Sequence, residues 1–398
     1  MNPDAFDPKS MPGKLVPTMF IEQYATETGF AAREVRGQGF LPDALPPKLD
    51  LGPLLVRLHP ALVNAERALS LLEGSARRLT NPHLLMGAFS QREAILSSRI
   101  EDTFASVSDV AMVEVAPREL ANRSDAQEVR NYITALEHGL RSELPLCLRL
   151  IRDMHRHLLK GEAGQNKQPG EFRNTQNAIG SSGGFANARF VPPPPQQLTA
   201  CLNDFESFMH ETESDVPRLI RFAMLHYQFE TIHPFLDGNG RLGRLLITLM
   251  LCEQGQLTKP LVYVSGFFER HRQAYYDLLQ GVSTHGQWEP WIAFFLDAIA
   301  TQAQDAVSRA DRLLDLQAQY HAAVRQKRAS PLLPVLIDQL FAQPVVTAAS
   351  VTTRCDCTKP TAQRLIDTLV AKDILEEMTG RTNYRVFSAP KIMQLIME

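Results

Sequence analysis

The feature that most constrains the fold is the segment HPFLDGNGRLGR at residues 233–244, which lies between two apolar stretches with helical spacing, RFAMLHYQFETI and LLITLMLCEQ. This arrangement predicts two buried helices joined by a polar loop that runs into the N-terminus of the second helix. The first amide groups of a helix lack partners within it, and the aligned peptide dipoles attract negative charge. Gly238 and Gly240 also allow the backbone to approach an anion closely. The segment therefore predicts a phosphate-binding loop.

The polar side chains of the same segment indicate which chemistry the loop supports. Asn239 adds an amide donor, and Arg241 and Arg244, three residues apart on the following helix, can hold phosphate oxygens by charged, forked hydrogen bonds. Asp237 is a hard oxygen ligand for a Mg²⁺ ion that bridges two phosphate groups. His233 is the only group in the segment that can accept a proton near neutral pH. The segment predicts attack of a hydroxyl group on a nucleotide phosphate.

Every defined position of the segment matches the pattern H-x-F-x-(D/E)-G-N-G-R-x-x-R, so the segment resembles the active-site signature of the Fic family. The resemblance extends from about residue 80 to residue 300. It implies a protein adenylyltransferase that uses ATP and Mg²⁺ to transfer AMP to a Ser, Thr or Tyr hydroxyl of a target protein, including the enzyme itself. It implies that His233 is the catalytic base, that Asp237 is the metal ligand and that Phe235 is a core anchor. The nucleotide-binding residues that it implies are Gly238, Asn239, Gly240, Arg241, Leu242, Gly243 and Arg244.

Two further segments resemble parts of the same family. GEFRNTQNAIGSSGGFANARFVPPPP, residues 170–195, predicts a β-hairpin with a Gly-rich loop. It resembles the flap that holds a target peptide by strand addition, with Ile179 and Gly180 on its edge. FFERHRQAYYDLLQ, residues 267–280, resembles the helix that walls the nucleotide base, with Tyr275 and Tyr276 as candidates. A plain surface hairpin and a purely structural role for the tyrosines remain open alternatives.

The sequence SSRIED at residues 97–102 resembles the family's inhibitory motif, (S/T)-x-x-x-E-(G/N). Ser97 and Glu101 are four residues apart and share a helix face. The resemblance implies that Glu101 pairs with Arg244, so that ATP binds in an unproductive orientation. Asp102 departs from the expected Gly or Asn, which leaves the local backbone geometry open. Two alternatives remain at this point: a solvated glutamate, or a hydrolase in which Glu101 orients a water molecule that removes AMP from modified targets.

The spacing of apolar residues in the rest of the chain predicts a mainly α fold with a C-terminal winged helix-turn-helix domain, and the resemblance implies a Fic-type helical core with a small β-hairpin flap. The opening 45 residues are rich in Pro and Gly and predict an arm that lies on the surface or is only partly ordered. Apolar residues recur at helical spacing over 54–72, with a kink or restart at Pro60, and over 82–112, 126–140, 145–159, 197–211, 217–231 and 291–314.

We predict four parts: an N-terminal arm and helical extension (1–75), a catalytic domain (76–315), a linker (316–330) and a winged-helix domain (331–398). In the last part we expect helices over 332–342, 348–354 and 359–372, and a strand-turn-strand over 374–387. DNA contact and protein docking are both open for this domain, and so is a homodimer. A further alternative for the whole chain is a DNA-binding regulator in which the nucleotide site is the sensor and the winged helix is the output. The residues that DNA contact would use are Lys359, Thr361, Gln363 and Arg364 on the second helix of the turn, and Arg381 and Arg385 beside the wing.

Composition limits the setting in which the protein works. The net charge of -3 excludes a uniformly basic surface. The five cysteines are too few and too scattered for a disulfide framework, and the spacing of Cys355 and Cys357 does not fit a zinc site. The first residues lack the pattern of a secretory signal, and no stretch reaches the roughly 20 apolar residues of a spanning helix. We therefore expect a cytoplasmic protein without a membrane partner.

Overall fold

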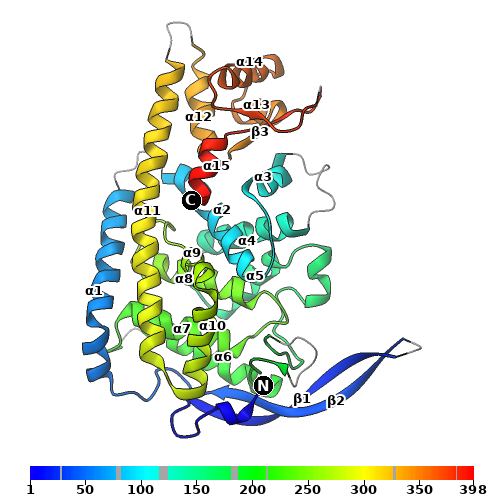
Figure 1. Ribbon diagram of the computed structural model, residues 1–398, viewed down its shortest axis with the longest axis vertical. Coiled ribbons are helices and arrows are strands. Elements are labelled where there is room, and N and C mark those ends of the chain that lie inside the picture. Colours follow the sequence, from blue (N-terminus) through cyan, green and yellow to red (C-terminus); the bar gives the residue numbers. More distant parts are fainter. Residues whose placement is uncertain are drawn as a thin grey trace.

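The computed structural model describes residues 1–26, 29–77, 82–115, 124–180, 187–211, 214–325, 329–381 and 383–398. It is mainly helical, as predicted, and elongated (Figure 1). The helices up to the end of the catalytic part are α1 (Leu51–Ala76), α2 (Pro82–Ile100), α3 (Val107–Val115), α4 (Ser124–Arg141), α5 (Leu148–Leu158), α6 (Pro195–Met209), α7 (Arg218–Ile232), α8 (Asn239–Glu253), α9 (Ser265–Arg270), α10 (Arg272–His285) and α11 (Trp288–Val324).

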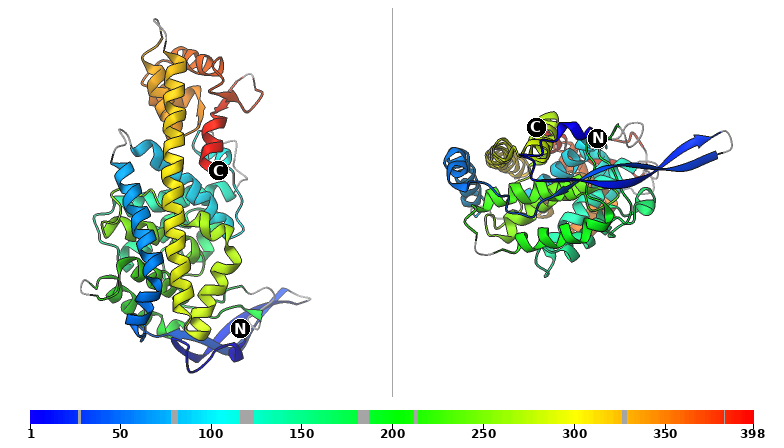
Figure 2. Two further views of the ribbon diagram at one scale, coloured as in Figure 1. Left: turned by 60° about the vertical axis from the view of Figure 1, so that its left-hand side comes forward. Right: turned by 90° about the horizontal axis from the view of Figure 1, so that it is seen from below.

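Helix α11 runs along most of the length of the molecule, and α1 packs beside it in each view (Figures 1 and 2). The apolar face of α1 is buried through Leu54, Leu58, Leu69 and Leu72. Helix α1 is continuous through Pro60, so no new helix begins there. Packing of this apolar face supplies the stability that a proline inside a helix removes.

Helices α7 and α8 form the centre of the core and carry the loop at residues 233–238 between them. Almost every residue of both helices is buried, including polar ones such as His226 and Gln228. This burial on all sides explains why the flanking stretches are apolar almost throughout. The loop is thus attached at both ends to buried helices of the core.

The N-terminal segment differs from the surface arm that we predicted. Strands β1 (Gly13–Thr26) and β2 (Gly29–Pro42) form a long antiparallel hairpin in the register Gly13↔Pro42 to Thr26↔Gly29, and this hairpin projects beyond the helical body (Figure 2). Its base is held by tertiary contacts: the Phe40 amide donates to the Val191 carbonyl at 2.8 Å, and the Thr18 hydroxyl donates to Gln176 Oε1 at 2.7 Å. Its Pro and Gly residues hide the alternation that normally marks a strand.

Three other elements differ in length from the prediction. The hairpin expected over 170–195 consists, in its described part, of one antiparallel bridge between Ile179 and Phe190, and residues 181–186 lie outside the described part. The helix expected over 82–112 divides into α2 and α3, because Asp102 adopts a left-handed conformation with φ 60°. Helix α11 continues to Val324, so the first residues of the predicted linker 316–330 are helical.

The C-terminal part is a helix-turn-helix domain with a small sheet. Helices α12 (Leu332–Ala342) and α13 (Ala348–Arg354) have the predicted bounds, and α14 (Lys359–Val370) ends two residues early. Strands β3 (Val345–Thr347), β4 (Glu376–Glu377) and β5 (Val386–Ser388) pair in the order β3-β5-β4, and α15 (Pro390–Met397) closes the chain. The prediction did not include β3 and α15, which are short and depend on tertiary contacts.

Helix α2 connects the C-terminal domain with the helical core. Gln91 Nε2 donates to the carbonyl of Ala342 at 3.3 Å, and α2 also packs against α15. Its C-terminal end reaches α8, where Ser97 contacts the arginine that follows the loop. None of the helices described in this structure has the length and apolar character needed to cross a membrane.

Candidate active site

A cavity of about 430 Å³ opens where the loop at 233–238, α8, the end of α2, α10 and the bridge at Ile179 meet. We call it the motif cavity. Its wall contains eight of the residues that the sequence singled out, although they come from segments far apart in the chain. These residues are Glu101, Ile179, Gly180, His233, Gly240, Arg244, Tyr275 and Tyr276.

His233 caps the C-terminus of α7 in a left-handed conformation, with φ 49°. Its Nδ1 lies 3.2 Å from the carbonyl oxygen of Glu230. Because a carbonyl can only accept, Nδ1 carries the proton and Nε2 keeps its lone pair. Burial lowers the pKa of His233 to about 4, against the smaller opposing effect of the hydrogen bond to Glu230. The imidazole is therefore neutral at physiological pH and can accept a proton in the cavity.

Asn239 closes the loop and does not face the cavity, in contrast to the donor role that we predicted for its side chain. Its Oδ1 accepts from the Phe235 amide and its Nδ2 donates to the Phe235 carbonyl, both at 2.9 Å. Asn239 is only 1% exposed, and Phe235 is fully buried as expected of an anchor. Gly238, between Phe235 and Asn239, has φ 74°, a conformation that glycine adopts without strain. The side chain of Asn239 thus fixes the shape of the loop.

His155 on α5 is a loop-positioning residue that sequence reasoning missed. The Gly170 amide donates to its Nδ1 at 2.8 Å, so Nε2 must carry the proton that is shared with the Asp237 carbonyl at 3.0 Å. Its ring stacks on Phe235 with centroids 3.7 Å apart. Burial lowers its pKa to about 4, which keeps this tautomer neutral. In the sequence His155 is only one residue of an amphipathic helix, so nothing there indicates that it positions the loop.

Arg173 is a second residue that the sequence did not reveal. Its guanidinium donates to the carbonyl oxygens of His233 (2.8 Å), Pro193 (2.6 Å), Thr175 (3.2 Å) and Ile232 (3.3 Å). Burial lowers its pKa to about 10, so it remains charged at neutral pH. The guanidinium group has five N–H donors in a fixed planar geometry, so one arginine can bind several carbonyl oxygens from different segments. Arg173 ties the flap segment to the loop that carries His233.

Asp237 and Arg241 are not among the residues that line the motif cavity. Arg241 Nη1 donates to Glu128 Oε2 at 2.7 Å, a partner on α4 that the sequence did not indicate. Asp237 Oδ1 lies 3.6 Å from Arg241 Nη2 and accepts from the Gly238 amide, while 42% of its side chain is exposed. Among the residues that the structure describes, no three His, Cys, Asp or Glu side chains gather as a metal site. Asp237 Oδ2 also lies 3.8 Å from Lys167 Nζ, so Asp237 is an accessible carboxylate with two neighbouring cations. Mg²⁺ is commonly held by one or two carboxylates together with substrate phosphates.

Leu242 and Gly243 belong to the helix packing and not to the cavity wall. Leu242 is fully buried in the core. The carbonyl of Gly243 accepts from His226 Nδ1 at 3.2 Å, and a Cβ added at this glycine would lie 2.3 Å from Glu230 Oε1. A role for these two residues in nucleotide binding would therefore have to be indirect, through the position of α8.

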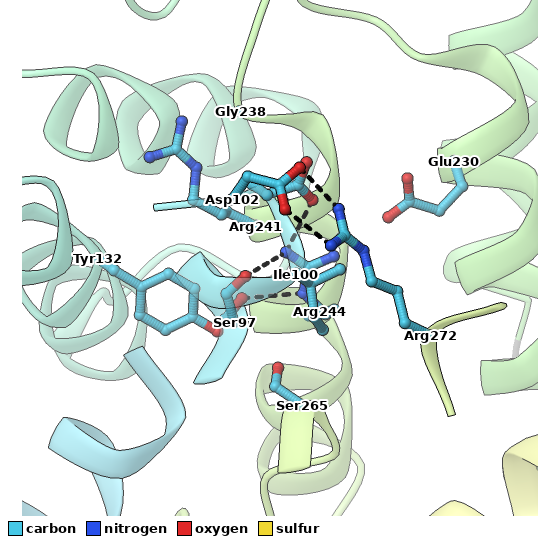
Figure 3. Close-up of polar contacts among 12 residues, drawn as sticks. Ser97, Ile100, Asp102, Tyr132, Glu230, Gly238, Arg241, Arg244, Ser265 and Arg272 are labelled. Carbon is cyan, nitrogen blue, oxygen red and sulfur yellow. Dashed lines mark hydrogen bonds and ion pairs between the residues drawn. The ribbon is translucent and has the colours of Figure 1, made fainter. Parts of the chain in front are cut away.

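Arg244 and Glu101 are paired as the sequence predicts (Figure 3). Arg244 Nη2 donates to Glu101 Oε1 at 2.9 Å and to the Ser97 carbonyl at 2.9 Å, and Nε donates to the Ser97 hydroxyl at 2.9 Å. Arg244 is only 1% exposed. Burial is the largest single effect and opposes its charge, but Glu101, Tyr275, Glu230 and Tyr276 together raise the pKa of Arg244. A Cβ at Gly240 would lie 2.3 Å from Glu101 Oε1, so glycine makes room for this carboxylate.

The two tyrosines of α10 differ in their surroundings. Tyr275 is 1% exposed, stacks on Phe268 and lies 2.8 Å from His226 Nε2 through its hydroxyl group. Tyr276 is only partly buried, and its hydroxyl donates to the Ile100 carbonyl at 3.3 Å. Both residues line the motif cavity, but Tyr275 is also a core residue. Tyr276 thus has the more accessible ring for a ligand.

Glu230 adds an unusual acid to the cavity wall, which the sequence did not single out. Burial raises its pKa to about 8, so this carboxyl is mostly protonated at neutral pH. Its Oε1 is buried and has no hydrogen-bond partner among the described residues. The cavity therefore holds a neutral base, a neutral acid and an arginine blocked by a carboxylate.

Comparisons with known families agree with this arrangement. Residues 145–251 match the Fic/DOC family, residues 59–141 match the N-terminal region of that family, and residues 333–388 match an HTH DNA binding domain. Similar curated proteins are the protein adenylyltransferase Fic of Aedes aegypti (35% identity over 153 residues) and that of Drosophila grimshawi (32% over 167 residues). These alignments cover 38% and 42% of this chain, but only 27% and 30% of the relatives.

Two solved structures share the fold. A Fic family protein from Desulfovibrio desulfuricans superposes with a TM-score of 0.52 at 20% identity, over 83% of this chain and 96% of that one. A Fic domain containing signaling protein from Bacteroides thetaiotaomicron gives 0.50 at 18% identity, over 63% of this chain and 97% of that one. At this identity the likeness concerns the fold alone.

Proposed function

Because residues 145–251 are a Fic/DOC-family domain preceded by the N-terminal region of that family, we propose that this protein transfers AMP from ATP to a hydroxyl side chain of a target protein. The observation that carries the proposal is the neutral Nε2 of His233 in the wall of a cavity that also holds Arg244 and the N-terminus of α8. A base and anion donors around one cavity are the parts that phosphoryl transfer requires.

In the proposed reaction, the target hydroxyl attacks the α-phosphorus of ATP while His233 Nε2 takes its proton. A bond forms between the hydroxyl oxygen and the α-phosphorus, the bond to the bridging oxygen breaks, and pyrophosphate leaves. The amides at the start of α8 and the guanidinium of Arg244 are suited to stabilise the phosphate charge. Arg241, which donates to Glu128, is the second arginine that we propose for these phosphates.

Asp237 is the residue that would hold Mg²⁺, which would neutralise charge on the phosphates. Tyr276, with Tyr275 behind it, is the proposed wall for the base. Ile179 and Gly180 would present an edge on which an extended target segment binds through main-chain hydrogen bonds. This mode of binding also allows a loop of the protein itself to be modified. The five cysteines are all free, which supports action in a reducing compartment such as the cytoplasm.

Intact-mass spectrometry of the Glu101→Gly protein, incubated with Mg²⁺ and ATP, tests this function. We expect the mass of the chain to increase by one AMP unit or more, and fragmentation to place each unit on a Ser, Thr or Tyr. A parallel sample with excess EDTA is expected to stay unmodified, because without Mg²⁺ no cation offsets the negative charges of the triphosphate and of Asp237. Addition of phosphate alone, or of AMP at lysine, would contradict the proposed reaction.

We further propose that the C-terminal domain binds DNA, on the strength of its match over residues 333–388. Lys359 and Arg364 are exposed on α14, the second helix of the helix-turn-helix. Electrophoretic mobility shifts with the full chain should show binding that weakens as salt increases, and Lys359→Ala or Arg364→Ala should each reduce the salt dependence by about one released counterion. No shift at low salt would instead leave the domain as a protein-docking module.

A further inference from the structure

Two ion pairs lie side by side at the motif cavity, and they use consecutive acidic residues. Glu101 pairs with Arg244 at 2.9 Å, and Asp102 pairs with Arg272 through two hydrogen bonds, of 2.8 and 2.9 Å (Figure 3). All four residues line the cavity. The inhibitory role that the sequence predicts concerns only the first pair, so the second pair requires its own explanation.

Asp102 occupies a position where the backbone favours another residue type. Its φ of 60° is left-handed, a conformation that glycine adopts freely and other residues adopt at a cost. The aspartate at this position therefore contributes something that glycine would not. Its carboxylate contacts Arg272, and the hydrogen bonds to this arginine lower the pKa of Asp102. The contribution of Asp102 is thus a negative charge placed against Arg272.

Arg272 is fixed at the cavity independently of Asp102. It is the first residue of α10, and its guanidinium lies over the ring of Tyr276, 5.9 Å from the centroid. About two fifths of its side chain, 39%, is exposed. A guanidinium that is stacked on an aromatic ring loses little freedom when it binds an anion. If Asp102 moves away, this cation remains directed toward the cavity.

The positive charges of Arg244 and Arg272 are balanced by the carboxylates of residues 101 and 102. Their departure leaves the guanidinium groups of Arg244 and Arg272 beside each other without their carboxylates. Such an arrangement is unfavourable unless an anion with several charges is bound, and a triphosphate meets this requirement. We propose that Arg272 is a second phosphate-binding residue of the nucleotide site and that Asp102 holds it in the inhibited state, so that one segment releases two arginines together.

This inference rests on the proposed function in that the ligand is ATP, but it can be tested without AMP transfer. Isothermal titration calorimetry on the full chain would compare ATP with adenosine, in the Glu101→Gly background with and without Arg272→Gln. We expect the second change to weaken ATP binding about tenfold, as loss of a charge-assisted hydrogen bond does, and to leave adenosine binding unchanged. Arg57→Gln is the matched control, because Arg57 forms an exposed ion pair with Glu289 away from the cavity.

The role of Asp102 requires a double-mutant cycle. Asp102→Gly suits the left-handed backbone and removes the charge, so we expect ATP binding to tighten by up to about fivefold, the range of an exposed ion pair. The same change in an Arg272→Gln protein should have no effect. The inference is overturned if Arg272→Gln leaves ATP binding unchanged, if it weakens adenosine binding equally, or if the gain from Asp102→Gly persists without Arg272.

Failure of the inference and failure of the proposed function give different results. If ATP binding depends on Arg272 but no AMP reaches any protein, the phosphate-binding assignment stands and the adenylyltransferase proposal falls. If AMP is transferred while ATP binding ignores Arg272, only the present inference falls. A thermal melting curve of each variant is the control that tests whether the compared proteins are folded.

Discussion

Replacing His233 with alanine in the Glu101→Gly protein is expected to lower the rate of AMP transfer by about 10²- to 10⁴-fold, the usual contribution of a general base. The loop should keep its shape, because Asn239, Phe235 and Arg173 hold it through contacts that do not involve the imidazole ring. The measurement is the initial rate of label transfer from [α-³²P]ATP to protein. ATP affinity should change much less than the rate.

His138→Ala is the control for this experiment, since His138 is a partly buried histidine on α4 outside the motif cavity wall. It should retain the rate of its parent protein. A His233→Ala protein that is folded and transfers AMP at the parent rate would remove His233 as the base. Equal losses in ATP affinity and rate would instead make His233 a binding residue.

Replacing Glu101 with glycine is expected to raise the rate of AMP transfer by about tenfold to hundredfold over the wild type. Hydrogen bonds to charged groups contribute about 1.5–3 kcal/mol, and about 1.4 kcal/mol corresponds to a factor of ten. The pair with Arg244 must be broken before this arginine can orient a phosphate. The measurement is again label transfer, at saturating ATP, so that a change in affinity is not mistaken for a change in orientation.

Glu101→Gln should give a smaller increase, because it removes the charge but leaves a side chain of the same size beside Gly240. Glu289→Gln is the matched control: Glu289 is also in an ion pair, and 40% of its side chain is exposed against 38% for Glu101. A rate that responds equally to the changes at 101 and 289, or to neither, would remove the inhibitory role of Glu101.

The sequence predicted the parts of the fold that depend on local patterns. Helices α12 and α13 begin and end where apolar periodicity places them, and the loop between α7 and α8 lies where its glycines require. The pairing of Glu101 with Arg244 was also predicted, although 143 residues separate them, because a motif relates the two positions.

Contacts between distant segments without such a motif could not be predicted. His155 and Asp237 are 82 residues apart, and Arg241 and Glu128 are 113 apart, so no local periodicity relates them. The long N-terminal hairpin was missed for a different reason. Its strands contain Pro17, Gly37 and Gly39, and its base is stabilised by contacts with residues 176 and 191, which propensity alone cannot anticipate.

A crystal structure of the Glu101→Gly protein with Mg²⁺ and a non-hydrolysable ATP analogue tests the central claim most directly. We expect the triphosphate at the N-terminus of α8, with Arg244 on its outer phosphates and the α-phosphorus facing His233 Nε2. A nucleotide bound elsewhere, or an α-phosphate on the far side of the loop from the imidazole, would contradict the account.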